Sequence, residues 1–220
     1  MDNGSTDATI DYLSGYVSRG EIKLLHQPIK GAPAARNMGW EAAQGDWIQF
    51  LDADDIIMPN KVKHQIELLE QSTSSSFVAA AAIKTDMETG ESIIWPVMPD
   101  VWHGLLQNSL GNTIANLFSR KVLEQVGGWD TSLKSSQEYD LMFRIMKHSD
   151  NVLIDTKEAN SVVRLRASGS ISKTDILGNK HRFLHNVSRV AIFMKANKKE
   201  NYLALGDAYF QKMYLRIRLN

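Results

Sequence analysis

The sequence predicts an α/β fold, in which helices flank a mainly parallel β-sheet. Segments with apolar residues at helical spacing alternate with short apolar runs along the 220 residues, as is typical of βα units. The run WIQFL at 47–51 is compact and apolar, which favours a strand that pairs parallel and is buried on both faces. There is no cysteine, so disulfides and thiolate metal sites are excluded.

Apolar spacing and turn residues give the order of the expected elements. Helices are favoured where apolar residues recur every three or four positions, and strands where they are contiguous. The expected helices cover about residues 10–17, 34–44, 60–70, 121–126 and 137–148, with two more after Asp175. The expected strands cover about residues 21–26, 47–51, 77–84, 91–97, 151–155 and 161–166.

Charge is distributed unevenly along the neutral chain. Residues 173–220 contain 10 Lys/Arg and 3 Asp/Glu, a net charge of +7, which leaves −7 on residues 1–172. We therefore expect a core domain at 1–172 and a basic helical extension at 173–220. The extension favours contact with an anionic membrane surface, or it is simply a solvated helix face; nucleic acid is not the expected partner.

No signal for export or membrane insertion is found in the sequence. No apolar run reaches the roughly 18 residues of a membrane helix, and no basic start is followed by an apolar stretch. The expected location is the cytoplasm, with peripheral contact to the inner face of the membrane through the basic extension.

Three acids directly follow the 47–51 run. Asp52, Asp54 and Asp55 repel one another, so a nearby cation is expected. Oxygen ligands at the carboxyl end of a strand suit Mg²⁺ or Mn²⁺, which keeps other positions for water and substrate phosphates. Alternatively, these side chains cap the helix that begins near Pro59.

Four segments in this order resemble the family-2 glycosyltransferases, which have the GT-A nucleotide-sugar fold: DNGSTD, GAPAARNMGW, WIQFLDADD and GGWDTSLKSSQEYDLMFRI. The resemblance covers roughly residues 2–172. In that family a strand, a helix and a second strand precede DNGSTD, so the resemblance implies an N-terminally truncated domain. The neighbouring strands would then expose unpaired backbone groups, which a rearrangement, a partner or another copy has to cover.

The resemblance implies a role for five residues. Asp2 matches an acid that contacts the nucleotide base, and Arg36 lies in a segment near the nucleotide. Asp52 and Asp54 match the metal- and nucleotide-binding DXD pair, with Asp54 as the expected direct metal ligand. Glu138 takes the place of the catalytic base, although the usual pattern there is Glu-Asp.

Glu138 also has a structural interpretation. Ser135-x-x-Glu138 is a capping-box pattern at the start of the helix expected from Gln137. As a base, its carboxylate would remove the proton from an acceptor hydroxyl, an assistance of about 10²–10⁴-fold. Both roles stay open on the sequence alone.

Further residues are expected around the substrates. Arg164 and Arg166, which precede the Ser168–Ser172 stretch, resemble a closing loop that contacts diphosphate, with Arg166 in place of a family histidine. Four residues are expected where the acceptor approaches: Trp102, His103, Asn112 and Thr113.

Together these features predict an inverting glycosyltransferase. It would use a nucleotide-diphosphate sugar, Mg²⁺ or Mn²⁺, and a glycan or lipid-linked acceptor such as those of the cell envelope. The alternative is a non-catalytic remnant of the fold that serves as an interaction module. A sugar nucleotidyltransferase is not favoured, since the chain has no glycine-rich activating loop.

Overall fold

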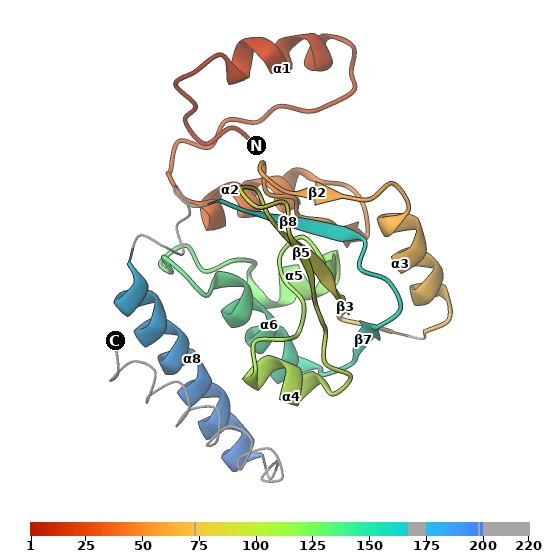
Figure 1. The fold of residues 1–220 in the computed structure, drawn as a ribbon, viewed down its shortest axis with the longest axis vertical. Coiled ribbons are helices and arrows are strands. Elements are labelled where there is room, and N and C mark those ends of the chain that lie inside the picture. Colours follow the sequence, from red (N-terminus) through yellow and green to blue (C-terminus); the bar gives the residue numbers. More distant parts are fainter. Residues whose placement is uncertain (73, 167–174, 198, 200–220) are drawn as a thin grey trace.

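The computed structural model describes residues 1–72, 74–166, 175–197 and 199 of the chain. Helices surround two small β-sheets that lie near the middle of the molecule (Figure 1). The helices are α1 (Thr9–Ser18), α2 (Ala32–Ala42), α3 (Lys61–Glu70), α4 (Val101–Leu106), α5 (Arg120–Val126), α6 (Gln137–His148) and α8 (Ile176–Ala196).

The strands form two mixed sheets of four strands, with the orders β1-β6-β3-β7 and β2-β8-β4-β5. Their bounds are β1 (Trp47–Ile48), β2 (Ile56–Ile57), β3 (Phe77–Ala80), β4 (Ala82–Asp86), β5 (Ser92–Trp95), β6 (Leu117–Ser119), β7 (Val152–Asp155) and β8 (Ser161–Leu165). The α/β architecture is as predicted, but only the pairs β3–β7 and β4–β8 are parallel. The other strand pairs of the described chain are antiparallel. Strand β5 forms a hairpin with β4, and β6 lies between β1 and β3 and runs antiparallel to both.

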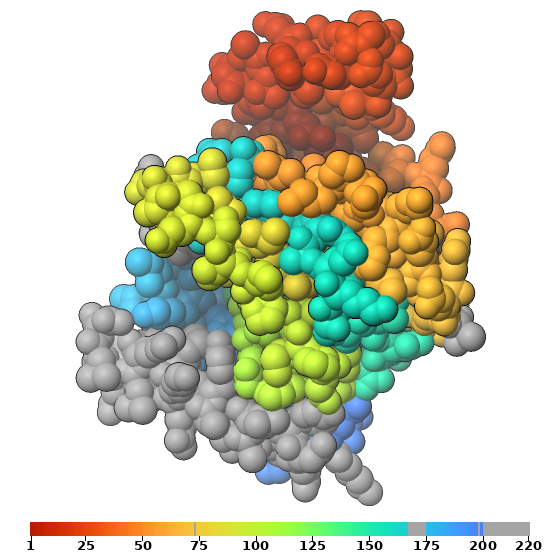
Figure 2. Space-filling model, turned by 45° about the vertical axis from the view of Figure 1, so that its right-hand side comes forward, coloured from red at the N-terminus to blue at the C-terminus, as the bar shows by residue number. Residues whose placement is uncertain are grey.

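The N-terminal segment stands apart from the rest of the molecule. Helix α1 has no buried residue, and it projects with its connections as a separate lobe (Figures 1 and 2). The strand predicted at 21–26 is not formed. In the described residues a parallel bridge between Asp2 and His26 takes its place.

The 47–51 run is buried only in part, and its pairing differs from the prediction. Ile48 and Phe50 are buried, whereas Leu51 is 51% exposed. Only Trp47 and Ile48 form a ladder, and they pair antiparallel with β6 rather than parallel. A cavity of about 520 Å³ lies beside this run, lined by residues 47–53, by Met1 and by residues of α2 that include Arg36 and Trp40.

Helix α8 packs on the main core. Its residues Val187, Val190 and Met194 are buried, and Phe193 stacks on Trp102 of α4 with ring centroids 5.6 Å apart. The second helix predicted for the basic extension falls outside the described residues. No helix in the described ranges has the length and hydropathy that a membrane span requires.

A buried ion-pair cluster fastens α8 to α6. Asp140 on α6 is only 2% exposed, and its carboxylate accepts 2.7 Å hydrogen bonds from Arg144 and from Arg189 of α8. We expect Asp140→Asn to lower the free energy of unfolding by about 3 kcal/mol, because it leaves buried guanidinium charge uncompensated.

Urea unfolding measures this effect. Glu67→Gln is a matched control, because it removes the exposed Lys63–Glu67 pair and should change stability by less than about 0.5 kcal/mol. An Asp140→Asn protein as stable as the control would show that the cluster does not hold the two helices together.

Candidate active site

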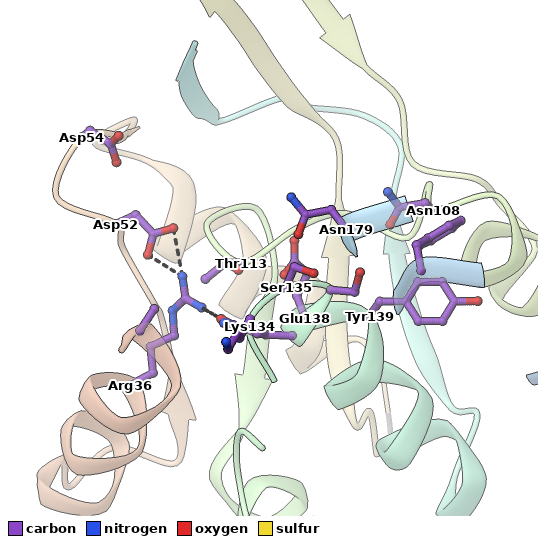
Figure 3. Close-up of a pocket in the computed structure, with 14 residues that line it drawn as sticks. Arg36, Asp52, Asp54, Asn108, Thr113, Lys134, Ser135, Glu138, Tyr139 and Asn179 are labelled. Carbon is purple, nitrogen blue, oxygen red and sulfur yellow. Dashed lines mark hydrogen bonds and ion pairs between the residues drawn. The ribbon is translucent and has the colours of Figure 1, made fainter. Parts of the chain in front are cut away.

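A second cavity of about 520 Å³, the cleft in Figure 3, brings together segments that are far apart in the sequence. One side comes from α2 and from the loop after the 47–51 run, and the other from the start of α6 and from α8. Its lining includes Arg36, Asp52, Asp54, Asn108, Thr113, Lys134, Ser135, Ser136, Gln137, Glu138, Tyr139, Asn179 and Phe183.

Arg36 links the two sides of the cleft. Its Nη2 donates to both carboxylate oxygens of Asp52, at 2.7 and 3.0 Å, and its Nη1 donates to Gln137 at 3.1 Å. The guanidinium also lies 4.6 Å from the ring centroid of the buried Trp129. Arg36 is thus held by an ion pair, a hydrogen bond and an aromatic face, and it fixes Asp52 beside the first turn of α6.

The acids after Leu51 have different surroundings. Asp54 lines the cleft, and the described residues provide its carboxylate with no hydrogen bond or ion pair. Asp55 instead accepts the backbone N–H of Arg164 at 2.9 Å, and burial raises its pKa, helped by the charges of Asp54 and Asp52. Arg164 also donates through Nε to the backbone carbonyl of Asp54, so it anchors the acidic loop to β8.

The capping interpretation of these acids is not seen. Helix α3 has Asn60 as its N-cap and no side-chain cap hydrogen bond, so Asp52 and Asp54 are not used in that way.

Glu138 lines the same cleft as Asp52 and Asp54. The N-cap of α6 is Ser136, with φ 56°, and no side-chain cap hydrogen bond is formed. Ser135 accepts a 2.7 Å hydrogen bond from Arg182 of α8 instead. The capping box that Ser135 and Glu138 could form is therefore absent, and within the described ranges the Glu138 carboxylate has no hydrogen-bond or ion-pair partner.

The first turn of α6 separates its two acids. Positions two apart on a helix point to different faces, so Glu138 faces the cleft while Asp140 is buried against Arg144 and Arg189. Of the two, only Glu138 can reach a ligand in the cleft.

Asp2 lies in the N-terminal lobe and lines neither cavity. Its carboxylate accepts the N–H groups of Gly4 and Ser5 at 3.2 and 3.1 Å and contacts His26 Nδ1 at 2.6 Å. The hydrogen bonds from Ser5, with smaller contributions from His26 and Gly4, hold the pKa of Asp2 far below its usual value. Asp2 thus organises the DNGSTD turn.

Of the four residues predicted near the acceptor, Thr113 alone lines the cleft. Trp102 is 2% exposed, donates to Asp150 at 2.8 Å and stacks on Phe193, so neither ring face is open to a sugar. His103 contacts Gln107 on its own helix, and Asn112 accepts the N–H of Ala115. The prediction for Trp102 is corrected by its burial, since α8 covers it.

Arg166 follows β8, is exposed and lines neither cavity, while the Ser168–Ser172 stretch lies outside the described residues. The structure adds cleft residues that the motifs did not indicate. Asn179 and Phe183 come from α8, and Asn108 has φ 54°, a conformation that asparagine adopts more readily than most residues. The αL preference of asparagine could have indicated Asn108, but no sequence signal pointed to the α8 residues.

The donor set of the cleft suits a hard divalent cation. Its acids offer only oxygen atoms, which Mg²⁺ and Mn²⁺ prefer, and the Asp54 carboxylate is not engaged elsewhere in the described chain. That part of the chain contains no group of three or more acids and histidines able to enclose a metal. An ion here would be held by one or two carboxylates and would share its remaining positions with water and phosphate.

The fold is of the GT-A type found in solved glycosyltransferase structures. The match to the solved structure of S. aureus TarS in complex with UDP-GlcNAc has a TM-score of 0.67 and covers 96% of this chain and 60% of that chain, at 14% identity. The chain belongs to glycosyl transferase family 2, because the model of that family matches residues 1–123, more than half of the chain.

Curated relatives also bear the glycosyltransferase name. An uncharacterized glycosyltransferase of Haemophilus influenzae is 29% identical over 129 residues, which are 56% of this chain and 44% of the relative. One from Rickettsia typhi is 25% identical over 228 residues, covering 90% of this chain and 70% of the relative. The chain thus spans less than half the length of the Haemophilus protein.

Proposed function

We propose that the chain transfers a sugar from a nucleotide-diphosphate sugar to an acceptor hydroxyl, with inversion at the anomeric carbon. One observation carries the proposal: Asp52 and Asp54 come from one segment and Glu138 from another, yet all three line one cleft. Figure 3 draws Asp52 and Asp54 on one side of it, with Glu138 nearer α8. Such an arrangement can hold a diphosphate at one end and activate a nucleophile at the other.

Glu138 is the proposed general base. Its carboxylate, free of partners in the described chain, would accept the proton of the acceptor hydroxyl as the oxygen attacks the anomeric carbon. The bond from that carbon to the diphosphate breaks on the opposite face, which inverts the centre. Arg36 orients Asp52, and through Gln137 it sets the distance between the acidic loop and the base.

Asp54 and Asp52 are the proposed ligands of Mg²⁺ or Mn²⁺. A bound divalent ion would offset the charge that develops on the diphosphate leaving group. Because Asp52 already pairs with Arg36, Asp54 is the principal ligand in this proposal.

The donor and the further partners are part of the same proposal. UDP sugars are the first candidates, since TarS was solved with UDP-GlcNAc and with UDP. The acceptor is a glycan or lipid-linked molecule, and the basic C-terminal extension brings the chain to an anionic membrane surface. A second copy or a partner would cover the cavity beside the 47–51 run.

A coupled assay for UDP tests the proposal. With UDP-GlcNAc and Mn²⁺ we expect slow release of UDP even without a known acceptor, because water can take the place of the acceptor hydroxyl. This release should stop when the ion is chelated. Isothermal titration with UDP and Mn²⁺ supplies a second readout. If the chain shows neither turnover nor metal-dependent binding with any nucleotide-diphosphate sugar, the alternative is favoured, namely a non-catalytic interaction module.

A further inference from the structure

A buried lysine at the start of α3 belongs to none of the motifs. Lys61, at the start of α3, is 1% exposed. Its amine donates to Gln49 Oε1 and, at 2.8 Å, to Gln65 Oε1. Within the described chain no carboxylate lies within ion-pair distance of it, so two amide groups are its hydrogen-bonding environment.

The two glutamines extend this contact to two segments that contribute residues to the cleft. Gln49 precedes Asp52 by three residues, and its Nε2 donates to the carbonyls of Phe50 and Ile114 at 2.5 and 2.9 Å. Gln65 donates to the carbonyl of Ala115 at 2.9 Å. Ile114 and Ala115 directly follow Thr113, which lines the cleft.

We infer that Lys61 is a positioning residue for the active site. Through Gln49 it holds the segment that carries Asp52 and Asp54, and through Gln65 it holds the segment that carries Thr113. A single buried amine thereby links two segments that each contribute residues to the cleft. The link to catalysis rests on the proposed function, whereas the link between the two segments rests on the hydrogen bonds alone.

The protonation state of Lys61 fits this role. Two acceptors satisfy the two hydrogens of a neutral amine, whereas an ammonium would keep a third donor buried without a partner. Burial lowers the pKa of Lys61 to about 7, opposed by the nearby charge of Asp155 on β7. Asp155 itself contacts His64 of α3 at 3.0 Å.

Stability should consequently depend on pH through Lys61. In the unfolded chain a lysine binds its proton up to about pH 10.5, while in the folded chain Lys61 loses it near 7. Between these values the unfolded state binds more protons, so the free energy of unfolding rises with pH from about 7 to about 10.5 and falls as pH drops toward 7. Lys61→Met should remove this rise.

Amide hydrogen exchange of segments 49–55 and 112–116 is the direct test. In Lys61→Met we expect amide exchange in both segments to be about tenfold faster. The reason is that each segment loses the support of one buried hydrogen bond, and the free energy of such a bond corresponds to about a tenfold change. Lys63→Met is the control, because Lys63 is 77% exposed on the same helix and should change neither segment. The Lys61→Met protein should also bind UDP with Mn²⁺ about tenfold more weakly.

A second variant covers the case in which Lys61→Met does not fold. Gln65→Met keeps the contact between Lys61 and Gln49, so it should speed exchange in 112–116 and leave 49–55 unchanged. Unchanged exchange in both segments of either folded variant would overturn the inference. If the wild-type chain itself fails to bind UDP with Mn²⁺, the proposed function is lost, but the exchange data still decide the role of Lys61.

Discussion

Glu138→Gln is expected to lower the rate of sugar transfer by about 10²–10⁴-fold while the affinity for UDP changes by less than about twofold. The amide has nearly the same shape but cannot accept a proton. In the described chain the carboxylate makes no hydrogen bond or ion pair, and it does not cap α6. The melting temperature should therefore stay close to that of the wild type.

Transfer rate, UDP affinity and melting temperature, measured on one preparation, separate the roles of Glu138. Glu124→Gln, at an exposed position of α5, removes the same charge away from the cleft and should leave all three unchanged. Parallel losses of transfer and UDP binding in Glu138→Gln would assign the residue to structure instead of catalysis.

Asp54→Asn is expected to weaken UDP binding in the presence of Mn²⁺ by about 100-fold or more, because it removes the principal proposed ligand. In the presence of a chelator, the variant and the wild type should bind UDP equally weakly. This difference isolates the metal contribution, since the backbone of the loop remains held by Arg164.

Calorimetric titration with and without Mn²⁺ measures both quantities. Asp46→Asn serves as the control, since Asp46 is an exposed acid at the other end of the same run. Full retention of the Mn²⁺-dependent affinity in Asp54→Asn would show that the ion binds elsewhere or that nucleotide binding does not use one.

Much of the fold was predictable because it follows from local signals. Helix α2 begins with Pro33 in its first turn, and α5 ends at Gly127, whose φ of 72° suits glycine. The pairing of the 47–51 run was predicted incorrectly as parallel. A buried apolar run shows that a strand is covered, but not which neighbour covers it, and here the neighbour is the antiparallel β6.

The site was predictable where a motif carried it and not where tertiary packing did. Asp52, Asp54 and Glu138 were named from the sequence segments that contain them, and these three residues line one cleft. Trp102 was misassigned because the sequence does not distinguish an exposed tryptophan from a buried one. In the structure Phe193 of α8 stacks on its ring and covers it. Phe183 and Asn179 were missed because α8 is brought to the cleft by packing on α6.

The most direct test of the central claim is a crystal structure of the chain with UDP-GlcNAc and Mn²⁺, with the ion located from its anomalous scattering. We expect one Mn²⁺ peak at direct ligand distance from Asp54, with the sugar in the cleft and Glu138 facing its anomeric carbon. Nucleotide bound away from the cleft, or an ion that touches neither Asp54 nor Asp52, would contradict it.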